Sequence, residues 1–300
     1  MQAATNAARR PSLDGLAISL ILVCCAIWGV NQVVVKLTLP EVPPLMQAGM
    51  RSAIAAALLW ALSARRGIVL LSRDGTGWPG IAAGVLFGLE FVCLYIGLQY
   101  TSASRLVVFL YLAPFVVAIG MPFISPSERP TRRQVAGLCA AFVSVAFAFR
   151  EGLAAAAPQQ WIGDGLAMLA GLLWGATTLA IRATSLAEAS PERTLFYQLA
   201  VSAPVLLAGA ALSGETMAWP PGPLAMGSIF FQSVVVAFAS YLGWFWLIRH
   251  YPATRVSSFT FLTPVFGLAF GVLLLGEELT PGLALALAGV ATGIWLVNRR

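Results

Sequence analysis

Long apolar stretches alternate along the whole chain with short breaks that carry charged residues, proline and glycine. The stretches lie at 15–36, 43–64, 78–99, 104–124, 131–149, 163–184, 193–213, 224–248, 256–275 and 281–297. Each is close to the roughly 20 apolar residues that an α-helix needs to cross about 30 Å of hydrocarbon. The pattern predicts an all-α integral membrane protein with ten transmembrane helices and only short connections between them.

Composition and charge agree with a membrane protein. Of the 300 residues, 59% are hydrophobic and 10% are charged, whereas a soluble domain carries about 25% charged residues. The 18 Lys and Arg exceed the 12 Asp and Glu. In a soluble domain this excess would suggest binding to nucleic acid. Here the arginines stand at the ends of the apolar stretches, so the excess indicates topology and predicts no nucleic-acid partner.

The basic residues also predict the orientation in the membrane. If the N-terminus is cytoplasmic, the outer loops receive only Lys36, Arg105 and Arg150, and Arg51 lies inside a span. The remaining arginines then lie on the cytoplasmic side, where loops of membrane proteins concentrate positive charge. Both termini are therefore expected in the cytoplasm.

The two halves of the chain resemble each other. Asp14-Gly15-Leu16 and Trp28-Gly29 recur as Asp164-Gly165-Leu166 and Trp174-Gly175, and a basic residue follows each Trp by eight positions, at Lys36 and Arg182. A gapless shift of 150 pairs a further set: Ala103, Arg105, Phe109, Leu112, Pro114 and Glu128 with Ala253, Arg255, Phe259, Leu262, Pro264 and Glu278. Because each half holds five predicted spans, an odd number, residues 1–150 and 151–300 are predicted to form an inverted repeat of two five-helix units.

These motifs resemble a known family. A Trp-Gly in the first helix of each half, Pro44 and Arg51 in the second, and a Leu-x-Pro late in the fourth followed by Gly276-Glu277 resemble the EamA branch of the drug/metabolite transporter superfamily, and within it the YddG-type aromatic amino acid exporters. The resemblance implies a multi-pass protein of the bacterial inner membrane. It implies export of aromatic and other neutral amino acids, or similar small amphipathic metabolites, by alternating access, without a cofactor. The oligomeric state is not indicated.

Two ionisable residues, Arg51 and Glu90, fall inside predicted spans at similar depth. Such residues are costly in hydrocarbon, by about 2.5 to 3.5 kcal/mol on insertion scales, and each therefore needs a structural or functional reason. One interpretation is a buried ion pair that neutralises both and stabilises the bundle. The other places one of them in a water-filled cavity, where it binds the charged end of a zwitterion or exchanges a proton.

Aromatic and polar residues near the centre of the spans suggest the substrate site. Trp28 and Trp174 stand at equivalent repeat positions, Tyr111 is matched by Phe261, and Asn31 lies about a turn deeper than Lys36, which we expect to be an interface anchor. An apolar pocket with a few polar groups would bind a large apolar or aromatic solute. The predicted substrate-binding residues are Trp28, Asn31, Glu90, Tyr111, Trp174 and Trp244. Pro114 and Pro264 are expected to bend their helices and to act as gates.

For several residues the sequence allows more than one role. Phe109 and Leu112, with their counterparts Phe259 and Leu262, share one helical face that serves either packing or a substrate wall. Gln232 is either part of a specialised pocket or an interhelical hydrogen-bond partner. The eighth span carries Gln232 and Ser240 where the first half has Glu90, and Ser202 lies near the position that matches Arg51. The cysteines at 24, 25, 93 and 139 are interpreted as core thiols, because no metal-ligand spacing surrounds them.

An intramembrane enzyme is not expected. His250 is the only histidine, the aspartates at 14, 74 and 164 are isolated, and the chain has no G-x-S-x-G motif and no P-loop. Neither a catalytic triad, a metal site nor an ATP-driven pump is therefore predicted. The alternatives to an amino acid exporter are an exporter of other metabolites or drugs and a passive channel. The partners expected are a small-molecule substrate and membrane lipid.

Overall fold

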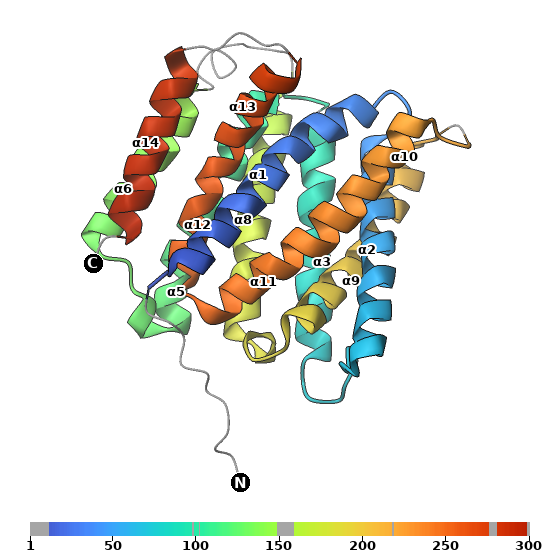
Figure 1. Cartoon of the computed structure of the whole chain (residues 1–300), viewed down its shortest axis with the longest axis horizontal. Coiled ribbons are helices and arrows are strands. Elements are labelled where there is room, and N and C mark those ends of the chain that lie inside the picture. Colours follow the sequence, from blue (N-terminus) through green and yellow to red (C-terminus); the bar gives the residue numbers. More distant parts are fainter. Residues whose placement is uncertain are drawn as a thin grey trace.

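The structure is a computed structural model, and it describes residues 12–97, 99–101, 103–148, 159–217, 219–275 and 281–298. Within these residues the chain forms helices and turns and no strand (Figure 1). The first half contains α1 (Gly15–Thr38), α2 (Pro44–Arg66), α3 (Gly77–Gly97), α4 (Ala103–Leu110), α5 (Ala113–Ile124), the short helix η1 (Pro126–Glu128) and α6 (Arg132–Ala148).

The second half contains α8 (Gln160–Ala183), η2 (Ser185–Ala187), α9 (Pro191–Leu212), α10 (Pro223–Phe230), the π-helical η3 (Phe231–Ser240), α11 (Tyr241–His250), α12 (Ala253–Ser258), η4 (Phe259–Phe261), α13 (Leu262–Leu275) and α14 (Pro281–Asn298). The elements α10, η3 and α11 follow one another without a break and form one long helix.

Six of the described helices are long and apolar enough to cross a membrane. They lie at Gly15–Val35, Pro44–Arg66, Gly77–Gly97, Gln160–Ala183, Pro191–Leu212 and Pro223–His250. The other four predicted spans fall on shorter or interrupted helices, among them α6 with 17 residues. The chain is thus an all-helical protein with several membrane-spanning helices, and the count of ten stays a prediction.

The sequence suggested that Pro114 and Pro264 bend continuous helices. The structure instead places both prolines in the first turn of a helix. The helix is interrupted at Tyr111 and Leu112, and Pro114 lies in the first turn of α5; likewise η4 separates α12 from α13, and Pro264 lies in the first turn of α13. Proline has no N–H and its ring clashes with the carbonyl four residues earlier, but the first turn of a helix tolerates it. Just upstream of the prolines the helical form changes instead, to a turn at Tyr111 and Leu112 in the first half and to the 3₁₀ segment η4 in the second.

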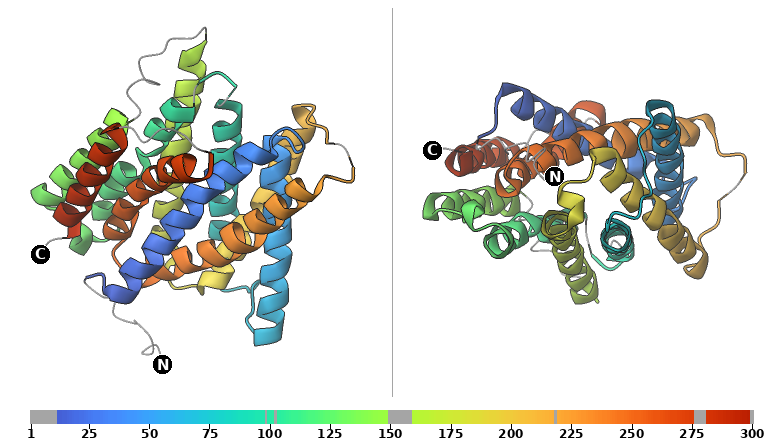
Figure 2. Two further views of the ribbon diagram at one scale, coloured as in Figure 1. Left: turned by 45° about the horizontal axis from the view of Figure 1, so that its top comes forward. Right: turned by 90° about the horizontal axis from the view of Figure 1, so that it is seen from below.

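The helices run between two ends of the bundle, which we name the Gly15 end and the Thr38 end after the bounds of α1. The helices α1 and α8 run in opposite directions, because α8 begins at the Thr38 end, where Thr101 donates a hydrogen bond of 2.8 Å to Asp164. Helices of the two halves interleave: α3 packs against α8 and α9, α2 against α9, and α1 against α13. Helices α6 and α14 form a pair at one edge of the bundle, seen in green and red in Figure 2.

Each Trp-Gly motif combines a ring that faces the interior with a close helix contact. A Cβ added at Gly29 would lie 2.6 Å from Cβ of Phe266 on α13, and one at Gly175 would lie 2.5 Å from Cβ of Val116 on α5. Only a residue without a side chain permits this approach of α1 to α13 and of α8 to α5. The motif therefore fixes the position of the preceding tryptophan.

The outer surface has the features of a lipid-facing protein. Trp78, Trp161 and Trp219 lie near helix ends with more than three quarters of their surface exposed, at 82%, 76% and 78%, as expected of an interfacial aromatic belt. The cysteine prediction holds for Cys24, Cys25 and Cys93, which are buried, but is wrong for Cys139, which is exposed on α6. An isolated apolar-type residue in a spanning helix faces lipid as readily as core, so sequence alone does not separate the two.

Candidate functional site

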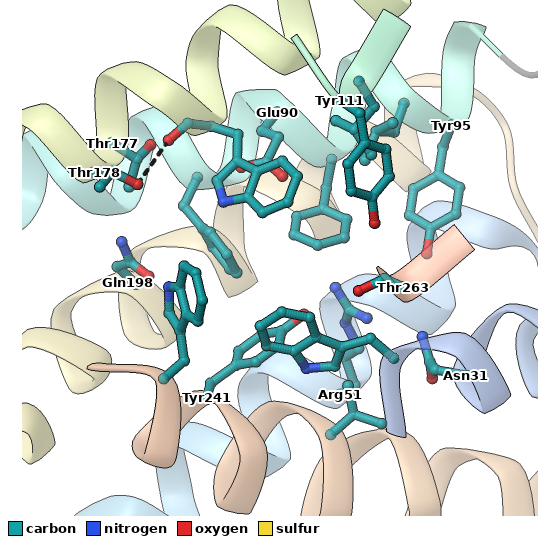
Figure 3. Close-up of a pocket in the computed structure, with 18 of the residues that line it drawn as sticks. Asn31, Arg51, Glu90, Tyr95, Tyr111, Thr177, Thr178, Gln198, Tyr241 and Thr263 are labelled. Atoms are coloured by element: carbon teal, nitrogen blue, oxygen red, sulfur yellow. Dashed lines mark hydrogen bonds between the residues drawn. The ribbon is translucent and has the colours of Figure 1, made fainter. Parts of the chain in front are cut away.

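A cavity of about 210 Å³ lies between the two halves of the chain. Its walls come from α1, α2, α3 and α4 on one side of the sequence and from α8, α9, η3, α11 and α13 on the other (Figure 3). All six residues that the sequence nominated for substrate binding line this cavity: Trp28, Asn31, Glu90, Tyr111, Trp174 and Trp244. The structure thus brings them together, and their role in binding stays a prediction.

Aromatic rings form the middle of the cavity wall. The ring centroid of Trp28 lies 5.4 Å from that of Trp244 and 6.1 Å from that of Tyr241, both edge to face. Across the cavity, Tyr111 and Trp174 meet edge to face at 5.8 Å. The indole N–H of Trp28 donates to the hydroxyl of Ser240 at 2.8 Å, which fixes the ring plane. We name Trp28, Tyr111, Trp174, Tyr241 and Trp244 the ring cage.

Arg51, Glu90 and Asn31 form a charged pole of the cavity, toward the Thr38 end. All three are buried, with 2%, 5% and 9% of their surface exposed. The guanidinium of Arg51 lies 4.3 Å from the ring centroid of Phe91. No ion pair within 4.0 Å joins Arg51 and Glu90, and Nε and Nη2 of Arg51, Oε2 of Glu90 and Oδ1 of Asn31 have no hydrogen-bond partner. Arg51 and Glu90 therefore line the same cavity without a direct salt bridge, and their roles stay a prediction.

A neutral polar group lies toward the Gly15 end of the cavity. Gln198 on α9 is 1% exposed, and both its Nε2 and its Oε1 lack a partner. The adjacent hydroxyls of Thr177 and Thr178 on α8 donate to carbonyls within their own helix, at 2.8 Å and 3.3 Å. Figure 3 draws the second of these bonds, from Thr178 to the carbonyl of Trp174. We name Gln198 with these two threonines the amide pole.

Sequence reasoning missed Gln198 because it placed Ser202 near the position of Arg51. The hydroxyl of Ser202 donates to the carbonyl of Leu199 at 3.3 Å, and Ser202 does not line the cavity. Helices α2 and α9 both start with a proline, Pro44 and Pro191, and Arg51 and Gln198 each follow that proline by seven residues. Counting from the helix-starting proline, rather than from a fixed shift, would have found Gln198.

Several residues for which the sequence left two interpretations pack between helices in the structure. The cavity wall from α4 and the turn after it consists of Leu106, Leu110 and Tyr111. Phe109, Phe259 and Leu262 are not part of it, so their shared face serves helix packing. Gln232 donates a hydrogen bond of 2.9 Å to Gln47 and is an interhelical partner. The side chains of Lys36, Arg105 and Arg150 and the segment Gly276-Glu277-Glu278 lie outside the described residues.

An ion pair lies at the Gly15 end, beyond the cavity wall. Ile181 and Phe245 line the cavity and also a smaller pocket on its far side. Beyond them Arg182 on α8 pairs with Glu128, with side-chain exposures of 1% and 10%. Arg182 donates to the carbonyl of Ile248 at 3.1 Å, and Glu128 accepts from the N–H of Ala253 at 3.1 Å. We name the Arg182–Glu128 pair the latch, because it joins the α5–α6 connection to α8 and α12.

A second ion pair at the same end is exposed. Arg193 at the start of α9 pairs with Asp74 in the α2–α3 connection, with side-chain exposures of 16% and 44%. The nearby Ser72 hydroxyl and the hydrogen bonds from Thr76 lower the pKa of the Asp74 carboxyl, and the Arg193 guanidinium lowers it further. Within the described residues no group of three or more His, Cys, Asp or Glu side chains is placed to hold a metal ion.

Comparison with known proteins agrees with the architecture. The chain matches the EamA-like transporter family over residues 15–150 and again over residues 161–299. It is 26% identical to a Salmonella typhimurium protein named probable amino-acid metabolite efflux pump, over 94% of this chain and 95% of that protein. It is 28% identical to a Chlamydia trachomatis protein named S-adenosylmethionine/S-adenosylhomocysteine transporter, over 96% of this chain and 90% of that protein.

One solved crystal structure superposes on the chain with a TM-score of 0.81 at 18% sequence identity. The superposition covers 95% of this chain and 96% of that one, and it shows a common fold.

Proposed function

The chain belongs to the EamA-like transporter family, and on that premise we propose that it exports aromatic and other neutral amino acids from a bacterial cytoplasm across the inner membrane. One observation carries the proposal: a single cavity between the halves combines a charged pole with a ring cage. Transporters of this general construction bind their substrate near the midplane and expose it to each side in turn. The family and its named relatives are transporters, which agrees with a non-enzymatic role.

We further propose that residues 1–150 and 151–300 form two five-helix repeats of inverted topology, with ten spans in all. Three observations support this. The family matches the two parts separately. Helix α1 packs on α13, and α8 packs on α5. Since the repeat equates α1 with α8 and α5 with α13, these two contacts are the same contact with the halves exchanged. Tyr111 and Phe261, which the repeat equates, contact each other with ring centroids 5.7 Å apart, as residues beside a two-fold axis do.

The Gly15 end is proposed to face the cytoplasm, following the distribution of arginines. In this orientation the latch closes the cytoplasmic side of the cavity. Single cysteines at Arg66 and Ser213, which are exposed at the Gly15 and Thr38 ends, test the orientation in a background where Cys139 is serine. An impermeant thiol reagent added outside intact cells should label Ser213→Cys and not Arg66→Cys. The reverse pattern would contradict this orientation.

The charged pole suits the zwitterionic head of an amino acid. The guanidinium of Arg51 is held against Phe91 and offers N–H groups without partners, so it is prepared to bind a carboxylate in a forked geometry. The free oxygens of Glu90 and Asn31 accept from an ammonium group. The substrate side chain then lies in the ring cage, where large apolar and aromatic groups gain from burial and edge-to-face contact.

Size and charge favour an amino acid over larger solutes. The cavity of about 210 Å³ is smaller than the roughly 300 to 1,000 Å³ of sites that hold drug-sized ligands. Among the described residues, Arg51 is the one Lys or Arg side chain in its wall, so a nucleotide sugar with several negative charges would lack partners. Because one methylene in an apolar pocket changes binding by only about 1 to 3 kcal/mol, phenylalanine, tryptophan and methionine should compete with one another.

Efflux from loaded cells tests the proposal. Cells that express the chain and are loaded with labelled phenylalanine should lose label faster than cells without it, and should be less sensitive to toxic phenylalanine analogues. Arg51→Lys keeps the charge but loses the forked geometry, so it should slow efflux. Arg65→Lys, at an exposed position of the same helix, is the matched control and should not. Equal efflux with and without folded protein would contradict the proposal.

A further inference from the structure

Gln198 is the polar side chain of the amide pole that the proposed binding of the zwitterionic head does not use. It is 1% exposed, lines the cavity, and has no partner on either amide atom. In Figure 3 it lies on the same side of the cavity as Thr177 and Thr178, opposite Asn31 and Thr263. Buried amide groups are nearly always hydrogen-bonded, and one without a protein partner indicates a ligand or water at that place.

The repeat explains why the two poles face each other along the cavity. Arg51 and Gln198 each follow the first proline of their helix by seven residues, which places both about 10 Å from the start of the helix. Helix α2 starts at the Thr38 end and α9 at the Gly15 end, so equivalent positions lie toward opposite ends of the bundle. One pole carries the charged side chains of Arg51 and Glu90, and the other is a neutral amide. A substrate bound between them therefore has one orientation, with its charged head at Arg51 and its side chain directed to Gln198.

A primary amide offers both a donor and an acceptor. The matching group on a substrate is one that also donates and accepts, such as a phenol hydroxyl or another amide. The threonines are less suited, because the hydroxyl protons of Thr177 and Thr178 are already used within α8.

We propose that Gln198 is a specificity-determining residue that binds a hydrogen-bonding group at the far end of the substrate side chain, so that the carrier prefers tyrosine to phenylalanine. This inference rests on the proposed function, since it concerns the side chain of the same substrate. With phenylalanine bound, the ring excludes water from the amide and offers it no partner, which penalises that complex. With tyrosine bound, the hydroxyl takes the place of the water. A single net hydrogen bond corresponds to a preference of about 2- to 10-fold.

Competition in liposomes tests the inference. Purified protein is reconstituted, and counterflow of labelled phenylalanine is inhibited by unlabelled phenylalanine or tyrosine. In the unmodified protein, tyrosine should inhibit at a concentration about 2- to 10-fold lower than phenylalanine. Gln198→Leu, which keeps the volume but removes the amide, should abolish or reverse this preference. Gln198→Met serves the same purpose if the leucine variant does not fold.

Gln47→Leu is the matched control, because Gln47 is equally buried but has partners in Gln232 and the carbonyl of Val42 and does not line the cavity. It should lower thermal stability and leave the ratio of the two inhibitory concentrations unchanged. An unmodified ratio of one, or a ratio that survives Gln198→Leu in folded protein, overturns the role of Gln198 while amino acid transport stands. Absence of counterflow with either amino acid in the unmodified protein instead overturns the proposed function, and this inference with it.

Discussion

Weakening the latch should open the Gly15 end of the cavity. In this structure Arg182 and Glu128 are almost fully buried, at 1% and 10% side-chain exposure, and in a state open at the Gly15 end water would hydrate both. Glu128→Gln keeps the shape, but its single side-chain oxygen can accept from Arg182 or from the N–H of Ala253 and not from both, whereas the carboxylate accepts from both. Charged hydrogen bonds contribute about 1.5 to 3 kcal/mol and neutral ones about 0.5 to 1.5 kcal/mol. The closed state should therefore lose about 1 to 2 kcal/mol.

A loss of this size corresponds to a roughly 5- to 30-fold shift in population toward the open state. Glu128→Ala should shift it further, because it leaves a buried guanidinium without its partner, which costs about 3 to 5 kcal/mol. The readout is the labelling rate of a single cysteine at Ile181, which lies between the cavity and the latch. The reagent is an impermeant thiol reagent supplied at the Gly15 end, and Cys139 is replaced by serine.

Asp74→Asn is the control for the latch experiment, because it breaks an ion pair at the same end that is exposed and remote from the cavity. It should leave the labelling rate of Ile181→Cys unchanged. If Glu128→Gln is folded and the labelling rate stays the same or falls, the latch does not hold the closed state and the reasoning is refuted.

Three further predictions follow from single contacts. Glu90→Gln should keep the folded yield, because no direct salt bridge joins Glu90 to Arg51. It should weaken the inhibition of labelled-phenylalanine counterflow by unlabelled phenylalanine but not by 3-phenylpropionate, which has no amino group. Equal effects on both inhibitors would contradict the role of Glu90 in binding the ammonium group. Gly137→Leu should lower the unfolding temperature in detergent, because a Cβ there would lie 2.6 Å from the carbonyl oxygen of Gly293 and overpacking costs about 1 to 3 kcal/mol. Hydrogen bonds lower the folded pKa of Asp74, so its stabilising effect should be complete above the unfolded pKa of about 3.9 and decline below it; the difference in unfolding temperature from Asp74→Asn should therefore shrink between pH 5 and pH 3, and a constant difference would count against it.

The residues that line the cavity could be predicted from the sequence because each is unusual within a membrane-spanning segment. A tryptophan that recurs at Trp28 and Trp174, or a carboxylate such as Glu90 within an apolar span, has few reasons to be there other than a polar or ring-lined interior. Asn31 was found by its depth relative to the end of the helix. These inferences depend only on helix periodicity and on the cost of burying charge, and both are local properties.

The residues that sequence reasoning missed depend on the register between helices. A fixed shift of 150 aligns Tyr111 with Phe261 but does not align Arg51 with Gln198, because the offset between the halves is already 146 at Trp28 and Trp174 and is 147 at Pro44 and Pro191. The absence of an Arg51–Glu90 ion pair could not be predicted either, since similar depth along two helices does not fix the distance between side chains. The same limit applies to Cys139, whose face on α6 depends on where α14 packs.

Counterflow in liposomes tests the central claim most directly, because it needs only the purified chain and one solute gradient. Liposomes preloaded with unlabelled phenylalanine should transiently accumulate labelled phenylalanine above its equilibrium level, and internal tryptophan or methionine should support the same accumulation. Nucleotide sugars inside should not. Well-folded protein that shows counterflow with a nucleotide sugar or S-adenosylmethionine, and with no amino acid, would contradict the assignment of the cavity to amino acids.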